Sequence, residues 1–231
     1  MKPADAHGVT GSARLSALVR ALHLASPALP VGGYAYSQAL ERAIEDGLID
    51  GEAAALRWIS DLLLLAIARF EAPLWLRAHA ARNTGDEAGF ARLNAEMLAA
   101  RETAELRAES RQMGASLVKL FPAFGIAAPA ADPIAYPAAF AAACAGFGLD
   151  REAGLAAYLW AWAENQVLAV VKALPLGQLA GQRMLIALHA TLARALGTAL
   201  EIPDEELGSA PVRFAIVSAR HEFQYSRLFR S

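Results

Sequence analysis

Apolar residues spaced three and four apart recur through most of this sequence, which is the spacing of one face of an α-helix. No segment shows sustained alternation of β-branched and polar residues, so nothing indicates a strand. Clusters of proline and glycine interrupt the helical pattern at a few places. The sequence therefore predicts an all-α fold, a single compact helical domain of roughly eight to ten helices with no sheet.

The periodic segments set the expected helices. The first carries Leu15, Leu18, Val19 and Leu22 on one face, with Ser12 as N-cap and an end near Ser26. Further helices are predicted over 40–48, 138–147, 151–173 and 178–199. Residues 52–83 are also expected to be helical, with a helix start or a kink at Pro73. Residues 87–120 are expected to form one helix or two. Residues 83–89, 121–137 and 201–211 are expected to be loops or linkers.

Composition excludes several classes of protein. With 231 residues, 56% of them hydrophobic, the chain can bury a large core, and its net charge of -2 disfavours nucleic-acid binding. The apolar segment 155–174 is interrupted by Glu164 and Lys172, so no membrane span is expected. The only cysteine, Cys144, is expected to be a buried thiol. The N-terminal residues lack a secretory h-region, which predicts a cytoplasmic protein.

Catalytic patterns are missing from the sequence. The five histidines show no metal-ligand spacing, so no metal site is predicted. Gly32 and Gly33 do not have the spacing of a phosphate-binding loop, and Ser37 is not in a nucleophile elbow. The acidic residues that follow are interpreted as the solvated face of a short helix: Glu41, Glu45 and Asp46. We therefore expect no catalytic residue.

Two segments stand out from the helical background. The loop, residues 26–39, lies within the stretch "SPALPVGGYAYSQALE", whose prolines stop one helix and whose glycines permit a tight reversal before the next. The C-terminal tail, residues 212–231, is apolar, aromatic and basic, with four arginines against one glutamate. It is expected either to complete the core as a strap or to bind a partner. We divide the chain accordingly into a helical domain, 1–211, and a docking tail, 212–231.

A third pattern lies at the start of the helix expected over 178–199. Gly177 and Gly181 are one turn apart, and Gln178 and Gln182 share nearly the same face. This arrangement favours tight internal packing. The alternative is a helix surface reserved for a partner.

Four stretches in the same order resemble the UreF family, the F-type urease accessory proteins, over nearly the whole chain. They are "ALHLASPALPVGGYAYSQALE" at 21–41, "RETAELRAESRQMGASLVKL" at 101–120, "VKALPLGQLAGQRML" at 171–185 and "SARHEFQYSRLFRS" at 218–231. The clearest departure is Ala39, where the family more often has glycine. Because we place Ala39 in a helix, this departure is not expected to matter.

The resemblance implies an all-helical, dimeric, non-enzymatic assembly factor. Such proteins join the D/H-type accessory protein and the G-type accessory GTPase on the urease apoprotein, where the complex supports GTP-dependent nickel insertion. No cofactor is expected to be bound by this chain itself, because nickel is handled within the complex.

The resemblance also implies roles for single residues. The segment "YSRLFRS" matches the part of the family that docks on the D/H-type partner, which points to Arg227 first, together with Leu228, Phe229 and Arg230. Tyr36 matches a loop tyrosine that orders the tail and forms the GTPase-recruiting surface. Lys172 matches a lysine associated with GTPase contact. The residues to which we assign structural roles are Gly32, Gly33, Gln178 and Gln182.

Two other functions stay open on the residues alone. One is an all-α enzyme that acts on a small molecule in a pocket lined by Tyr34, Tyr36 and His221. The other is a generic helical adaptor with no connection to urease.

Overall fold

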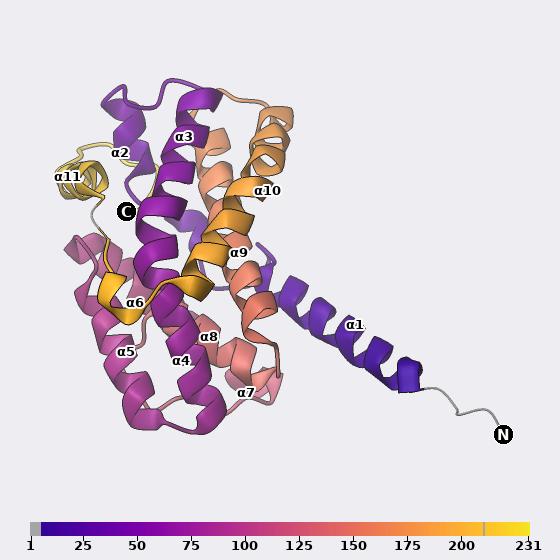
Figure 1. Cartoon of the computed structure of the whole chain (residues 1–231). Helices are drawn as coiled ribbons and strands as arrows, with labels where there is room; N and C mark the ends of the chain where they lie inside the picture. Colours follow the sequence, from indigo (N-terminus) through magenta and orange to yellow (C-terminus); the bar gives the residue numbers. More distant parts are fainter. Residues whose placement is uncertain (1–5, 210) are drawn as a thin grey trace.

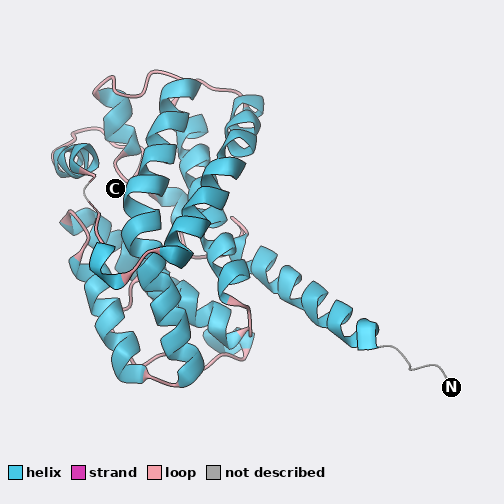
Figure 2. Ribbon diagram, viewed as in Figure 1, coloured by secondary structure: helices cyan, strands magenta, loops and turns pink. Residues whose placement is uncertain are grey.

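A computed structural model describes residues 6–209 and 211–231, with side chains from residue 11 onward. The chain is a bundle of α-helices with one helix that projects from it (Figures 1 and 2). No strand occurs among the described residues. The prediction of an all-α fold is therefore confirmed. None of the described helices combines the length and the low polarity needed to cross a bilayer.

The long central rod of the bundle consists of three consecutive elements: α3 (Glu52–Leu62), the π-helical η2 (Leu63–Glu71) and α4 (Ala72–Thr84). Pro73 lies in the first turn of α4, as the sequence predicts. A proline in this position has no N–H for the carbonyl four residues earlier, that of Arg69. This carbonyl instead accepts a hydrogen bond from the amide of Gly208, at 3.3 Å. The bulged geometry of η2 thus accommodates Pro73 without breaking the rod.

Two long helices, α9 (Arg151–Ala173) and α10 (Gln178–Glu201), pack against each other, and α10 also packs along η2 and α3. The helix α8 (Tyr136–Gly146) lies in the centre, where every residue from 137 to 144 is buried between α4 and α6. Its alanines allow these neighbours to approach closely. The observed bounds of α9 are those predicted from the periodicity.

The segment predicted as one helix or two, 87–120, forms two: α5 (Glu87–Ala99) and α6 (Ala104–Val118). Thr103 starts the second, since its hydroxyl accepts a hydrogen bond from the amide of Leu106 at 3.3 Å. Asp86 caps α5 through the amide of Gly89, at 2.8 Å, so the loop expected over 83–89 is only two residues long. A short helix, α7 (Phe121–Phe124), begins the linker that precedes α8.

The first helix, α1 (Ala6–Ala25), differs from its prediction. It begins before Ser12, which is therefore inside the helix and not its N-cap. Only its last turn is buried on the body, and the helix extends away from the other elements (Figure 1). The predicted apolar stripe faces solvent, with exposed fractions of 56–65% for Leu15, Leu18, Val19 and Leu22. Periodicity identifies an apolar face, but it does not say whether the same chain covers that face.

At one edge of the bundle, α2 (Leu40–Glu45) packs against α11 (Val212–His221), the helix of the C-terminal tail (Figure 1). The turn before α2 corrects the interpretation of Ala39. Ala39 has a φ of 64° and Gln38 has a φ of 52°, both in the left-handed region. Glycine adopts this conformation without strain, which explains why it suits position 39 better than alanine does. Two single-turn helices, η1 (Gly33–Ala35) and η3 (Asp204–Glu206), complete the fold.

Candidate protein-docking site at the loop and the C-terminal tail

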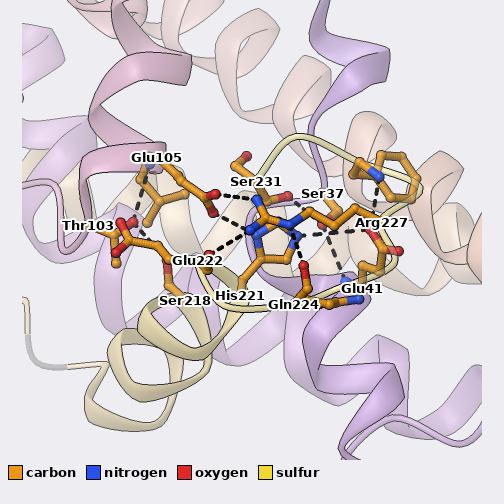
Figure 3. A network of polar contacts seen from close by, with 12 residues as sticks. Ser37, Glu41, Thr103, Glu105, Ser218, His221, Glu222, Gln224, Arg227 and Ser231 are labelled. Carbon is orange, nitrogen blue, oxygen red and sulfur yellow. Dashed lines mark hydrogen bonds and ion pairs between the residues drawn. The ribbon is translucent and has the colours of Figure 1, made fainter.

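The loop and the end of the C-terminal tail are joined by backbone hydrogen bonds, although they lie almost 200 residues apart in sequence. The amide of Arg230 donates to the carbonyl of Ala35 at 2.9 Å. The amide and the hydroxyl of Ser37 both donate to the carbonyl oxygen of Ser231, at 3.0 and 2.6 Å. Figure 3 shows Ser37 and Ser231 facing each other. The structure therefore brings together the two segments that stand out in the sequence.

A carboxylate on α2 completes this pairing. The amides of Leu228 and Phe229 donate to the two oxygens of Glu41, at 2.6 and 2.9 Å. The interpretation of Glu41 as part of a solvated face is thus wrong. Its carboxylate binds the backbone of the tail. The sequence of α2 does not distinguish Glu41 from the exposed Glu45.

A polar network lies at the bend between α11 and the extended end of the tail (Figure 3). His221 is 1% exposed, and its Nδ1 lies 2.7 Å from the carboxylate of Glu105. The same carboxylate forms an ion pair with Arg227. The guanidinium of Arg227 also donates to the carbonyls of Gln224 and Glu222, at 2.9 and 2.6 Å. Arg227 therefore holds the bend of the tail in this structure.

Tyr36 lies beneath the tail and is only 5% exposed. Its hydroxyl donates to the side-chain oxygen of Gln112 on α6, at 2.6 Å. Burial raises the pKa of Tyr36, and a hydrogen bond with the side chain of Arg230 partly opposes that effect. The buried tyrosine thus contacts both α6 and the end of the tail.

The side chains at the end of the tail alternate between the body and solvent. Phe229 is buried, and the ammonium of Lys172 lies 4.5 Å from the centre of its ring, a cation–π contact. Leu228, 50% exposed, and Arg230 are both exposed residues, although the side chain of Arg230 also hydrogen-bonds Tyr36. Tyr225, at the bend, is fully exposed. The docked tail thus presents apolar and cationic groups on a backbone that is already ordered.

Behind the tail lies a buried carboxylate, that of Glu109 on α6. It accepts hydrogen bonds from the hydroxyl of Ser231 at 2.5 Å and from the side-chain amide of Gln38 at 2.7 Å. The other end of the Gln38 amide accepts from the indole N–H of Trp162, at 2.7 Å. These contacts fix the left-handed turn at Gln38. Sequence reasoning missed both Gln38 and Glu109, because their partners lie on distant segments.

Comparison with known proteins assigns the chain to a family. A model of the UreF family matches residues 49–189. A urease accessory protein UreF of Azoarcus sp. (strain BH72) is 51% identical over 223 residues, which cover 93% of this chain and 95% of the relative. The chain belongs to the UreF family. The resemblance noted in the sequence is thereby confirmed.

Two further UreF relatives extend this result. A urease accessory protein UreF of Cupriavidus metallidurans is 47% identical, over 94% of this chain and 99% of the relative. A bifunctional urease accessory protein UreEF of Bordetella bronchiseptica is also 47% identical and matches 99% of this chain. The match covers 55% of that longer protein.

Four residues of this UreF-family chain are assigned structural roles: two loop glycines, Gly32 and Gly33, and two glutamines of α10, Gln178 and Gln182. Gly32 has a φ of 80°, a conformation that favours glycine, whereas a β-carbon at Gly33 would meet only ordinary contacts. Gln178 and Gln182 are exposed residues of α10, and the side chain of neither makes a hydrogen bond within the described part of the chain. The structural role assigned to these two glutamines stays a prediction. Gly181, in contrast, is buried, and a β-carbon there would lie 3.0 Å from Val171.

The pocket imagined for a small-molecule enzyme does not form. Tyr34 is 77% exposed and lines a cavity of about 90 Å³, whose lining includes neither Tyr36 nor His221. Both of those side chains are buried in the contacts of the tail. Among the described residues, no three histidine, cysteine or acidic side chains gather in a way that could hold a metal ion. Tyr34, Tyr36 and His221 therefore do not line one common pocket.

Glutamine at position 109 is expected to change how stability depends on pH. Burial raises the pKa of Glu109 above the 4.5 of an ordinary glutamate, so the folded state holds this proton more readily than the unfolded chain does. The contribution of Glu109 to the free energy of unfolding therefore falls as pH rises from 4.5 through the raised pKa. Glu109→Gln removes this fall, so its stability relative to the parent should increase with pH.

Urea denaturation between about pH 4.5 and 8 measures this difference. Glu96→Gln, which replaces an exposed carboxylate on the neighbouring helix α5, is the matched control. A difference between Glu109→Gln and the parent that stays constant across this range would contradict the expectation.

Proposed function

We propose that this chain is a non-enzymatic urease maturation factor that presents its C-terminal tail to the D/H-type accessory protein. The observation that carries the proposal is the paired loop and tail, which leaves Leu228 and Arg230 facing solvent on an ordered backbone. A preordered segment loses little conformational entropy on binding. Its apolar and cationic side chains suit a partner surface with an apolar recess and acidic groups.

Contact with the G-type GTPase is assigned to the adjoining surface at the end of α9. Lys172 lies there, and its ammonium, although in contact with Phe229, belongs to an exposed residue. Tyr36 contacts Arg230 and Lys172 contacts Phe229, so both residues adjoin the tail and one surface can bring both partners together. In this proposal the chain bridges the two accessory proteins on the urease apoprotein and supports GTP-dependent nickel insertion in the cytoplasm. Nickel is the cargo of the complex.

The printed names of the relatives support this role. All of those reported above are called urease accessory proteins, and the fused relative from Bordetella bronchiseptica combines two accessory activities in one name. Such a fusion is useful when the joined parts act in one assembly, since it raises their effective concentration. This supports a chain whose function consists of contacts with other accessory proteins.

The test of the proposed function is complementation. In cells that carry the urease genes and the other accessory genes but lack this one, the intact chain is expected to restore urease activity and the nickel content of urease. A chain that ends at Pro211 is expected to restore neither. Equal restoration by the two chains would contradict the docking role of the tail, and no restoration by the intact chain would contradict the maturation role itself.

We also propose that the chain is a homodimer, because the apolar stripe of α1 has no cover within the described chain. Leu15, Leu18, Val19 and Leu22 are each more than half exposed on a helix that projects from the body. A contiguous apolar stripe of this kind typically marks an interface. Two such stripes related by a two-fold axis would cover each other.

Leu18→Glu is expected to weaken this dimer by about 100-fold, because it places a charge at the centre of an apolar contact. Light scattering after size-exclusion chromatography, at concentrations around the dissociation constant of the parent, measures the shift from two chains to one. Ala13→Glu adds the same charge to the opposite side of α1 and is the matched control. If Leu18→Glu and Ala13→Glu have the same dimer dissociation constant, the interface does not lie on the apolar stripe of α1.

A further inference from the structure

The end of the C-terminal tail is held mainly by its backbone. Four consecutive residues, 228–231, each make a main-chain hydrogen bond to the body. Two of these bonds go to the main chain of the loop, at Ala35 and Ser37. The other two go to a single side chain, the carboxylate of Glu41. One ionised group therefore fixes two adjacent peptide units.

The geometry of Glu41 suits this task. Its side chain is 14% exposed, so water competes weakly for its oxygens. Each oxygen accepts one N–H, at 2.6 and 2.9 Å, and hydrogen bonds to an ionised acceptor are stronger than neutral ones. His221 lies on the same side, with Nε2 at 3.9 Å from one oxygen (Figure 3). Both parts of the tail, α11 and the extended end, thus meet at this carboxylate.

The turn before α2 orients the side chain of Glu41 toward the tail. Gln38 and Ala39 both have positive φ, a strained conformation for residues other than glycine. The turn is kept because the side chain of Gln38 is held at both ends, by Glu109 and by Trp162. As a result, Ser37 and Glu41 face the same short segment of the tail. Strain that is maintained in this way often marks a functional position.

We infer that Glu41 is a positioning residue that sets the conformation in which the tail is presented to its partner. Because Glu41 binds the backbone N–H groups of the tail, the half-exposed side chain of Leu228 stays free to contact the partner. This inference rests on the proposed docking function of the tail. It adds that presentation depends on a carboxylate that makes no contact with the partner itself.

The experiment compares Glu41→Gln with the parent by hydrogen exchange of the amides of Leu228 and Phe229. Glutamine has one acceptor oxygen and an NH₂ group that cannot accept from the second amide. We expect both amides to exchange at least about tenfold faster in Glu41→Gln, because the charge-assisted pair is lost. Glu45→Gln is the matched control, since Glu45 lies on the same helix, is exposed and pairs with Arg42.

Exchange at these amides that is unchanged in Glu41→Gln would overturn the inference. If Glu41→Gln does not fold, as judged by circular dichroism, Glu41→Asp provides the same test with the charge retained and the reach shortened, and faster exchange is again expected.

Capture of the purified D/H-type accessory protein by the full-length variants separates this inference from the proposed function. Faster exchange with at least about tenfold weaker capture supports both. Faster exchange with unchanged capture keeps the positioning role of Glu41 and contradicts docking through the tail. Unchanged exchange with weaker capture rejects the positioning role and leaves Glu41 as a direct partner contact.

Discussion

A chain that ends at Pro211 is expected to lose capture of the D/H-type accessory protein, with at least a 100-fold rise in the dissociation constant, roughly 3 kcal/mol. The truncation removes every residue assigned to that partner, and it also removes the segment that covers Tyr36 and Ser37. The loop loses its contacts with Arg230 and Ser231 as well. A pull-down with the purified partner measures the effect.

The control for truncation is the fold of the remaining body. The helices that bury α8, namely α4 and α6, lie outside the removed segment, so the truncated chain should keep its helical circular dichroism apart from the signal of α11. Capture of the D/H-type protein by a folded truncated chain, at the level of the intact one, would show that the tail is only a structural strap.

Replacing Gly114 with alanine is expected to lower the free energy of unfolding by about 2–4 kcal/mol. Gly114 lies where α6 meets the chain that leads into α8. A β-carbon there would overlap the carbonyl oxygen of Ile134 and would lie 2.9 Å from the carbonyl carbon of Ala135. Both are backbone atoms, so relief requires α6 and α8 to move apart, which loosens the buried centre of the bundle.

Gly197→Ala is the matched control for this substitution. Gly197 is also inside a helix, α10, but no atom lies within 4 Å of the position of its β-carbon. Alanine is the better helix former, so this variant should gain up to about 1 kcal/mol. Urea denaturation followed by circular dichroism measures both variants. Equal effects of the two substitutions would mean that the close approach at Gly114 is not needed for stability.

The helices could be predicted largely from local patterns, because each carries its own period and its own stop. The segment over 151–173 is the clearest case, with Asp150 as its cap through the amide of Ala153, at 2.6 Å. The projection of α1 could not be predicted, since an apolar stripe looks the same whether its cover is in the same chain or in another. The left-handed turn at Ala39 could not be predicted either, because alanine has the highest helix propensity and its neighbours in sequence fit a helix.

The site was only partly visible in the sequence. The loop and the tail stood out by composition, and the structure places them in contact. Glu41, Gln38 and Glu109 did not stand out, because their partners come from segments between 71 and 188 residues away. Arg227 illustrates the same limit, since its family match pointed to a partner whereas its guanidinium contacts Glu105 and two carbonyls of the tail.

The central claim is that the docked tail presents its outward side chains to the D/H-type accessory protein. Titration calorimetry with that protein and Leu228→Asp tests it most directly, because the Leu228 side chain is half exposed while its amide stays bound to Glu41. Leu179→Asp, an exposed leucine on α10, is the control. We predict a dissociation constant about 100-fold higher for Leu228→Asp, with hydrogen exchange of the tail unchanged. A dissociation constant within about twofold of that of the parent would contradict the claim.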